Sequence, residues 1–171
     1  PALFSFLRSA VNSGARDVQA VERTELLGRT NFYNEHVLER GIGRLEQLKK
    51  ALDHLTGSTL VFFDPDNGIE VRSKPMGTTG SAKYVYWREL KGAWDRKHSL
   101  LIYQHYPRIP RSRFESDIIT SCKDQLGVTP SLLCTSNVLF ILLSQPNHEA
   151  WAMKSRIAIG DRWRGQVEIK G

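Results

Sequence analysis

The chain has 171 residues, of which 40% are hydrophobic and 25% are charged, and its formal net charge is +6. This is enough for one globular domain with its own core, and the longest apolar run falls far short of the ~20 residues of a membrane-spanning helix, which excludes that class of protein. The two cysteines, Cys122 and Cys134, are too few and too far apart for a disulfide framework or a zinc site, so we expect a reduced, cytoplasmic protein.

The first expected elements are short. Apolar residues recur at helical spacing from Leu3 to Val11, and Asn12, Ser13 and Gly14 then supply a stop, which predicts an amphipathic helix. Polar and apolar residues alternate over residues 17–22, which favours a short strand near a sheet edge. The pattern between residues 26 and 39 favours no single structure.

A longer amphipathic helix is predicted over residues 40–55, and an apolar run over residues 59–63 follows it. That run is apolar on both faces and is bounded by Gly57 and Pro65, which is typical of a central strand in a parallel sheet. The next segment, residues 71–83, is a long loop rich in Gly, Ser, Thr and Lys. Such a loop is either functional or mobile, or it is a solvated connector.

The rest of the chain alternates between the two kinds of element. Helices are expected over residues 84–94 and 113–126 and near residues 148–153, and strands over 99–106, 132–134, 137–144 and 165–170. Alternating strands and helices over this length predict a single α/β domain built as a three-layer sandwich.

Polar side chains follow the two most strongly predicted strands. Asp64, Asp66, Asn67 and Glu70 come after the first, and Gln104 and His105 end the second, flanked by Tyr103 and Tyr106. The carboxyl ends of parallel strands meet at one sheet edge, where ligands of open α/β sheets bind. We therefore expect these side chains to share a site, provided that the two strands are parallel.

The element order over residues 40–170, with Asp64, Pro65, Asp66 and Asn67 in succession at a strand end, resembles the C-terminal half of a class I S-adenosylmethionine-dependent methyltransferase. Within that superfamily the chain is most similar to enzymes that methylate adenine N6 in ribosomal RNA or DNA, whose strand ends in Asp/Asn-Pro-Pro-aromatic. It also resembles an uncharacterised bacterial family that carries Asp-Pro-Asp-Asn-Gly and has a further N-terminal segment, which implies that this chain lacks such a segment.

The resemblance implies a Rossmann-like, mostly parallel sheet with a late antiparallel strand, S-adenosylmethionine as cofactor, and a domain that acts on or binds RNA or DNA. The net positive charge is compatible with such a polyanionic partner. The catalytic residues that it suggests are Asp64, Asp66, Asn67 and His105. The substrate-binding residues that it suggests are Pro65, Tyr103, Gln104, Arg108 and Arg111.

The chain departs from the methyltransferase pattern in two respects. Asp66 stands where the signature has its second proline, and Asn67 where it has the aromatic residue. No glycine-rich turn follows a predicted strand, since Gly41 and Gly43 lie at the start of a helical pattern.

Other interpretations of the same residues stay open. Asp64, Asp66 and Glu70 have the spacing and the hard oxygen ligands to hold Mg²⁺ in a nuclease or phosphatase. Asp66, Asn67 and Gly68 also fit a tight turn with no chemical role. His105 is a candidate base, a stacking group or a structural residue, and a non-catalytic interaction module is the third class of function.

Overall fold

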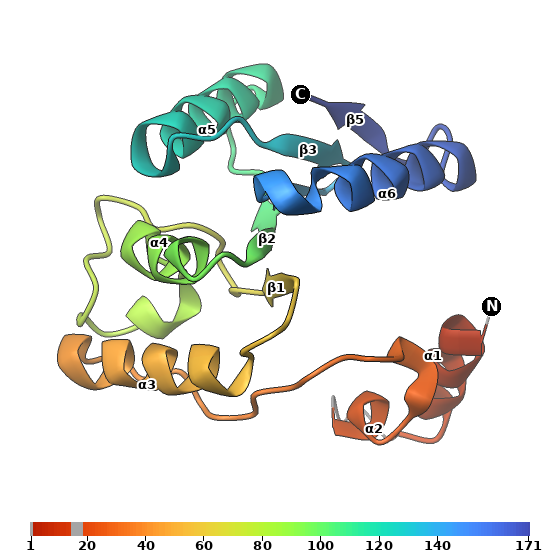
Figure 1. Ribbon diagram of the computed structural model, residues 1–171, viewed down its shortest axis with the longest axis horizontal. Helices are drawn as coiled ribbons and strands as arrows, with labels where there is room; N and C mark the ends of the chain where they lie inside the picture. The colour runs from red at the N-terminus through yellow and green to blue at the C-terminus, as the bar shows by residue number, and fades with distance from the viewer. Residues whose placement is uncertain (1, 15–18) are drawn as a thin grey trace. The chain divides into compact units, whose positions relative to one another are not determined.

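The computed structural model describes residues 2–14 and 19–171. The chain divides into two compact units, Pro1–Asn34 and Glu35–Gly171, and each is described by itself. All five strands of the sheet belong to the second unit (Figure 1). Among the described residues, no helix combines the length and the apolar character needed to cross a membrane.

The first unit consists of short helices. The predicted amphipathic helix is confirmed as α1 (Ala2–Asn12), and it is followed by α2 (Gln19–Glu22) and a 3-10 turn, Glu25–Leu27. The strand expected over residues 17–22 is wrong for Gln19–Glu22, which is helical, while residues 17 and 18 lie outside the described residues. A polar and apolar alternation this short also fits a single helical turn, so its period could not decide between the two structures.

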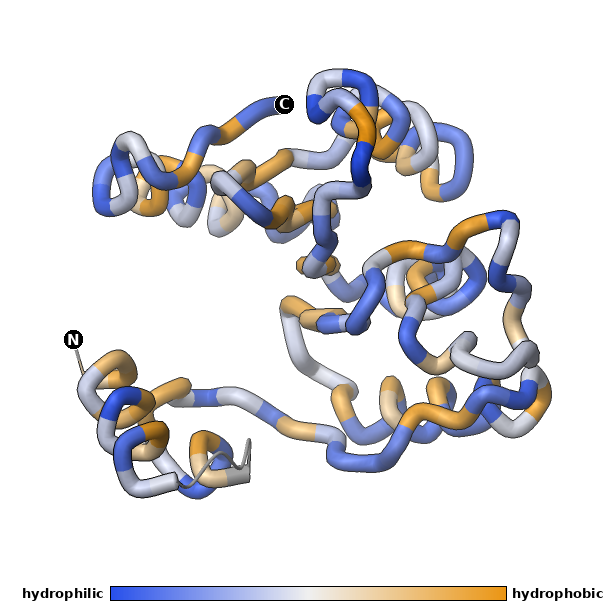
Figure 2. Tube along the Cα trace, turned by 180° about the vertical axis from the view of Figure 1, so that it is seen from behind, coloured by the Kyte–Doolittle hydropathy of each residue, from blue (hydrophilic) through white to orange (hydrophobic). Residues whose placement is uncertain are grey.

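The second unit contains four of the predicted helices and all of the strongly predicted strands. Its elements are α3 (Gly41–His54), β1 (Leu60–Phe63), α4 (Trp87–Asp95), β2 (Ser99–His105), α5 (Arg111–Leu126), β3 (Ser131–Cys134), β4 (Val138–Leu143), α6 (Glu149–Arg162) and β5 (Glu168–Lys170). Hydrophobic and hydrophilic residues alternate along α3, as expected for an amphipathic helix (Figure 2). The helix expected from residue 84 begins only at Trp87, because Val85 is extended and pairs with Ile69 in an isolated parallel bridge.

The sheet is mixed, with the strand order β1-β2-β4-β3-β5. Among the described strands β1 and β2 are parallel, and the other three pairings are antiparallel. The prediction of an α/β fold is confirmed, but that of a mostly parallel sheet with one late antiparallel strand is wrong, because a single described pairing is parallel and three are antiparallel. Residues 135–137, which join β3 to β4, are too few for a crossover connection, so these strands must form a hairpin.

The first predicted strand is correct in its extent and wrong in its place. We expected a central strand with both faces buried, yet β1 lies at an edge of the sheet. Val61 is 6% exposed whereas Phe62, on the opposite face, is 52% exposed. The uninterrupted apolar run of β1 therefore does not mean that both faces of this strand are buried.

The two faces of the sheet differ in their helical cover. On one face, Val61, Leu100 and Ile141 pack with buried residues of α3, α4 and α5 to form the main core. On the other face α6 lies over β3 and β5, where the Arg156 guanidinium donates to Ser131 Oγ at 3.2 Å. This second face is open next to β1.

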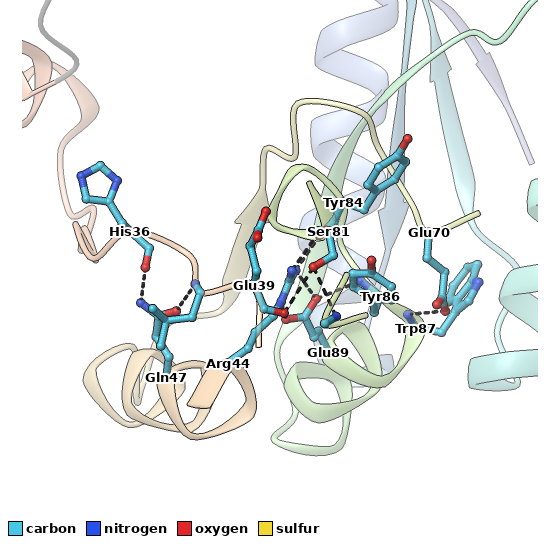
Figure 3. A network of polar contacts seen from close by, with 12 residues as sticks. His36, Glu39, Arg44, Gln47, Glu70, Ser81, Tyr84, Tyr86, Trp87 and Glu89 are labelled. Carbon is cyan, nitrogen blue, oxygen red and sulfur yellow. Dashed lines mark hydrogen bonds and ion pairs between the residues drawn. The ribbon is translucent and has the colours of Figure 1, made fainter. Parts of the chain in front are cut away.

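The long loop between β1 and α4 is anchored to α3 through a buried ion pair. Figure 3 shows Arg44 directed toward Glu89, with Nε 2.6 Å from Oε1 and Nη2 2.8 Å from Oε2. The same guanidinium donates to the backbone oxygens of Ser81, at 2.9 Å, and Tyr84, at 2.6 Å. Such a bidentate pair with two further bonds holds the loop in one position beside the sheet edge.

Candidate functional site

The predicted site begins at the carboxyl ends of β1 and β2. These strands run parallel and pair from Leu60 with Ser99 to Phe63 with Ile102. Asp64 directly follows β1, and His105 is the last residue of β2. The prediction that the acidic tip and the histidine tip meet at one edge of the sheet is confirmed, because it depended on this direction.

The acidic loop is a tight turn held by a buried glutamine. Gly68 has φ +85°, and its amide lies 3.3 Å from the Pro65 carbonyl oxygen. Gln104 Oε1 accepts a hydrogen bond from the Ile69 amide at 2.8 Å, and Gln104 Nε2 donates to the His105 carbonyl oxygen at 2.8 Å. Gln104, predicted to bind substrate, therefore holds the loop against β2 through its Oε1, while its Nε2 is hydrogen-bonded to the next residue of β2.

One hollow opens on the exposed face of the sheet, and we call it the sheet-face hollow. It encloses about 470 Å³ and is lined by Phe62, Asp64, Pro65, Asp66, Tyr103, His105 and Phe140. The Tyr103 ring contacts His105 and Phe140 edge to face, with centroid distances of 4.9 and 5.4 Å. The floor of this hollow is therefore aromatic, and two carboxylates stand at its rim.

A second hollow lies toward the helices, and we call it the helix-side hollow. It encloses about 670 Å³, and its lining includes Asn67, Glu70, Trp87 and Asp117. Asp66 and His105 line both hollows, so they form the ridge between them. Glu70 Oε1 accepts a hydrogen bond from the Trp87 amide at 3.0 Å, which occupies this carboxylate at the start of α4.

The three carboxylates that were proposed as alternative metal ligands, Asp64, Asp66 and Glu70, do not surround one common point. Asp64 lines the sheet-face hollow, whereas Glu70 lines the helix-side hollow and caps α4. Within the described parts of the chain, no three His, Cys, Asp or Glu side chains lie together as a set that could hold a metal ion. Asp64, Asp66 and Glu70 therefore do not fit the hydrolase site for which their spacing was suggestive.

The residues needed to seat S-adenosylmethionine are likewise not assembled. Gly41 and Gly43 begin α3, and Arg40 before them is extended but belongs to no described strand. In the described second unit, no glycine-rich turn leads from a strand into a helix. We derive no methyl-transfer step from this geometry.

The two predicted arginines, Arg108 and Arg111, lie where β2 leads into α5, and both are exposed. The Arg111 guanidinium lies 4.8 Å from the centroid of the Tyr106 ring and donates a hydrogen bond to the Ser136 carbonyl oxygen. Arg111 is thus fixed beside the hairpin between β3 and β4.

A larger cavity lies beyond these residues, and sequence reasoning missed it. This α6 cavity encloses about 1190 Å³. It is lined by residues from β2 and the segment after it, α5, the β3–β4 hairpin, the end of α6, the turn after α6, and β5, among them Leu101, Tyr106, Arg111, Glu115, Leu133, Phe140, Ile159, Trp163, Val167 and Lys170. These residues come from distant parts of the chain, so no local sequence motif indicates the cavity.

A buried carboxylate organises the polar side of the α6 cavity. Glu115 accepts hydrogen bonds from the Tyr106 hydroxyl at 2.9 Å and from Lys170 Nζ at 2.8 Å. Burial alone would raise the pKa of Glu115, but the hydrogen bonds from Lys170 and Tyr106 outweigh it and hold that pKa below its ordinary value. Burial and the bond to Glu115 also raise the pKa of Tyr106, so a neutral phenol faces an ion pair.

No protein-family model matches the chain, and no curated protein or solved structure is significantly similar to it. The methyltransferase resemblance therefore stays a prediction that rests on residues and element order.

Proposed function

We propose that this chain binds single-stranded nucleic acid by stacking unpaired bases on the sheet-face hollow. The observation that carries the proposal is the aromatic floor of Tyr103, His105 and Phe140 on an open face of the sheet, with Phe62 half exposed beside it. Aromatic side chains on open sheets stack bases in known RNA-binding domains. A side chain as large as Phe62 gains nothing from exposure to water alone, so its position favours an apolar or aromatic ligand.

The carboxylates at the rim indicate which part of the ligand faces them. Asp64 and Asp66 are both exposed and would repel phosphates. A carboxylate does accept hydrogen bonds from the exocyclic amino group of a base, as Asp and Glu do with cytosine. We therefore orient the strand with its bases toward Asp64 and Asp66 and its phosphates away from these two carboxylates.

The formal net charge of +6 supports a polyanionic ligand. The proposal keeps the substrate class that the methyltransferase resemblance implies. It leaves out transfer from S-adenosylmethionine, because the described residues offer no glycine-rich loop for that cofactor.

The test measures binding of fluorescently labelled RNA octamers of adenosine, cytidine or uridine by anisotropy at one fixed salt concentration. We expect adenosine and cytidine octamers to bind more tightly than uridine octamers, because uracil has no exocyclic amino group. Tyr103→Leu keeps an apolar contact with Phe140 but removes a stacking surface worth ~1–3 kcal/mol, so it should weaken adenosine binding about 5- to 150-fold.

Trp151→Ala is the matched control, because Trp151 is an exposed aromatic residue of α6 outside the sheet-face hollow and should not affect binding. Asp66→Asn should reduce the preference for adenosine over uridine. Equal affinities for Tyr103→Leu and wild type, with both proteins folded by thermal melting, would refute stacking in this hollow.

A further inference from the structure

We infer that the bound strand continues from the sheet-face hollow into the α6 cavity, where Trp163 stacks a further base and Arg111 contacts a phosphate. The inference rests on the proposed function, since it extends the same binding surface. It assigns a role to a cavity that the predicted site does not include.

The two spaces share a wall. Phe140 lines both the sheet-face hollow and the α6 cavity. It pairs with Tyr103 on one side and with Leu133 on the other, so one row of side chains crosses three strands on the same face of the sheet. Leu133 in turn lines the α6 cavity, and the row therefore leads from the aromatic floor into that cavity.

The distance along this row calls for a second stacking surface. Adjacent strands lie ~4.8 Å apart, so Tyr103 and Leu133 are separated by roughly 10 Å. Stacked bases are separated by only ~3.4 Å along a strand. A nucleic acid that follows the row therefore carries its next bases past Tyr103, and they need a surface of their own to remain out of water.

Trp163 supplies such a surface at the far end of the row. It follows the last residue of α6, lines the α6 cavity and is 41% exposed. Its neighbours in the lining, Ile159 and Val167, are apolar. An indole face with an apolar surround suits a base, and it carries no hydrogen-bond acceptor that would select one base over another.

Arg111 makes the same cavity suitable for a charged backbone. Its guanidinium has five N–H donors, and its described hydrogen bond to Ser136 uses one of them. Stacking on Tyr106 orients the group in the lining of the cavity. The nearby Glu115 carboxylate is neutralised by Lys170, so it opposes a phosphate only weakly.

The experiment compares an adenosine dinucleotide with an adenosine octamer, both as RNA, by fluorescence titration and calorimetry. The dinucleotide is long enough for the sheet-face hollow alone, whereas the octamer also reaches Trp163. Trp163→Leu keeps an apolar wall and should weaken the octamer about 5- to 150-fold while leaving the dinucleotide unchanged. Trp151→Leu is the matched control, because Trp151 lies in α6 with 43% exposure and lines neither space, and it should change neither affinity.

The outcomes separate this inference from the proposed function. If Trp163→Leu and Trp151→Leu bind the octamer equally while Tyr103→Leu still weakens it, the inference is overturned and the proposed function stands. If wild-type protein binds neither RNA, both are overturned. Tryptophan quenching by the octamer that is lost in Trp163→Leu but kept in Trp151→Leu supports the inference, and equal quenching of the two variants overturns it.

Discussion

The turn that carries the two acidic residues depends on a glycine at position 68. Gly68 has φ +85°, a conformation that side chains with a Cβ rarely adopt. A Cβ built at this position would overlap the amide group of Gln104. That amide is buried, accepts a hydrogen bond of 2.8 Å from the Ile69 amide of the loop and donates one of 2.8 Å to the His105 carbonyl oxygen, so a displacement of the amide disturbs both bonds.

The size of the effect can be worked out with a second glycine as reference. Gly57 has φ +86°, but a Cβ there meets no atom within 4 Å, so Gly57→Ala isolates the conformational cost of ~1–2 kcal/mol. Gly68→Ala has the same cost and also displaces the Gln104 amide. Two lost hydrogen bonds contribute ~0.5–1.5 kcal/mol each, so we expect Gly68→Ala to lower the free energy of unfolding by about 2–5 kcal/mol.

The assay is urea-induced unfolding with linear extrapolation, carried out on a double-mutant cycle. Gln104→Ala removes the obstacle, so adding the Cβ at position 68 to that variant should cost only as much as Gly57→Ala. The free energy lost by the double variant should therefore be smaller than the sum of the two single losses. The reasoning is refuted if Gly68→Ala costs no more than Gly57→Ala, or if the effects of Gly68→Ala and Gln104→Ala simply add.

Two further predictions concern buried charges. Glu89→Gln leaves the buried Arg44 guanidinium without its counter-charge and should cost about 3–5 kcal/mol in urea unfolding, whereas replacing both residues by methionine should cost less than the sum of the single changes; additive losses would contradict this. The pKa of Glu115 lies below its ordinary 4.5, because hydrogen bonds from Lys170 and Tyr106 outweigh its burial, so its stabilising effect is present above pH 4.5 and disappears as the pH falls through the folded value. The hydrogen bond to Glu115 raises the pKa of Lys170 above 10.5, so that contribution is present below pH 10.5 and disappears as the pH rises through the folded value. Glu115→Gln should flatten both limbs of the stability profile measured by thermal melting, and an unchanged profile would exclude the ion pair as their origin.

Local patterns were sufficient to predict most of the elements. The apolar spacing of α3 and the apolar runs of β1 and β2 mark these elements in the sequence, and the structure places them there within one or two residues. The shared edge of β1 and β2 followed from two strands separated by a helix, which is the arrangement that gives a parallel pair. The position of Asp64 next to His105 at that edge was predictable for the same reason.

Contacts between distant residues were not predictable in this way. Glu115 and Lys170 are separated by 55 positions, and Arg44 and Glu89 by 45, so no spacing rule connects them. Each pair is satisfied only because the sheet order places β5 beside β3 and the helices α3 and α4 side by side. The α6 cavity was missed for this reason, since its polar side is built from such a pair.

The same residues explain why β1 was wrongly predicted to be a central strand and why its exposed face is proposed to bind a ligand. A strand with one face in the core and one face in water normally alternates apolar with polar residues, and a run without polar residues is interpreted as buried on both sides. Phe62 and Tyr103 occupy the outward positions of β1 and β2, where that rule expects polar side chains, and yet Phe62 is 52% exposed. Aromatic residues on an open sheet face produce the same uninterrupted apolar run as a central strand, although their side chains remain accessible to a ligand. The departure from the periodicity rule therefore coincides with the residues that we assign to base stacking, and replacing Phe62 with a polar residue should affect RNA affinity far more than the stability of the fold.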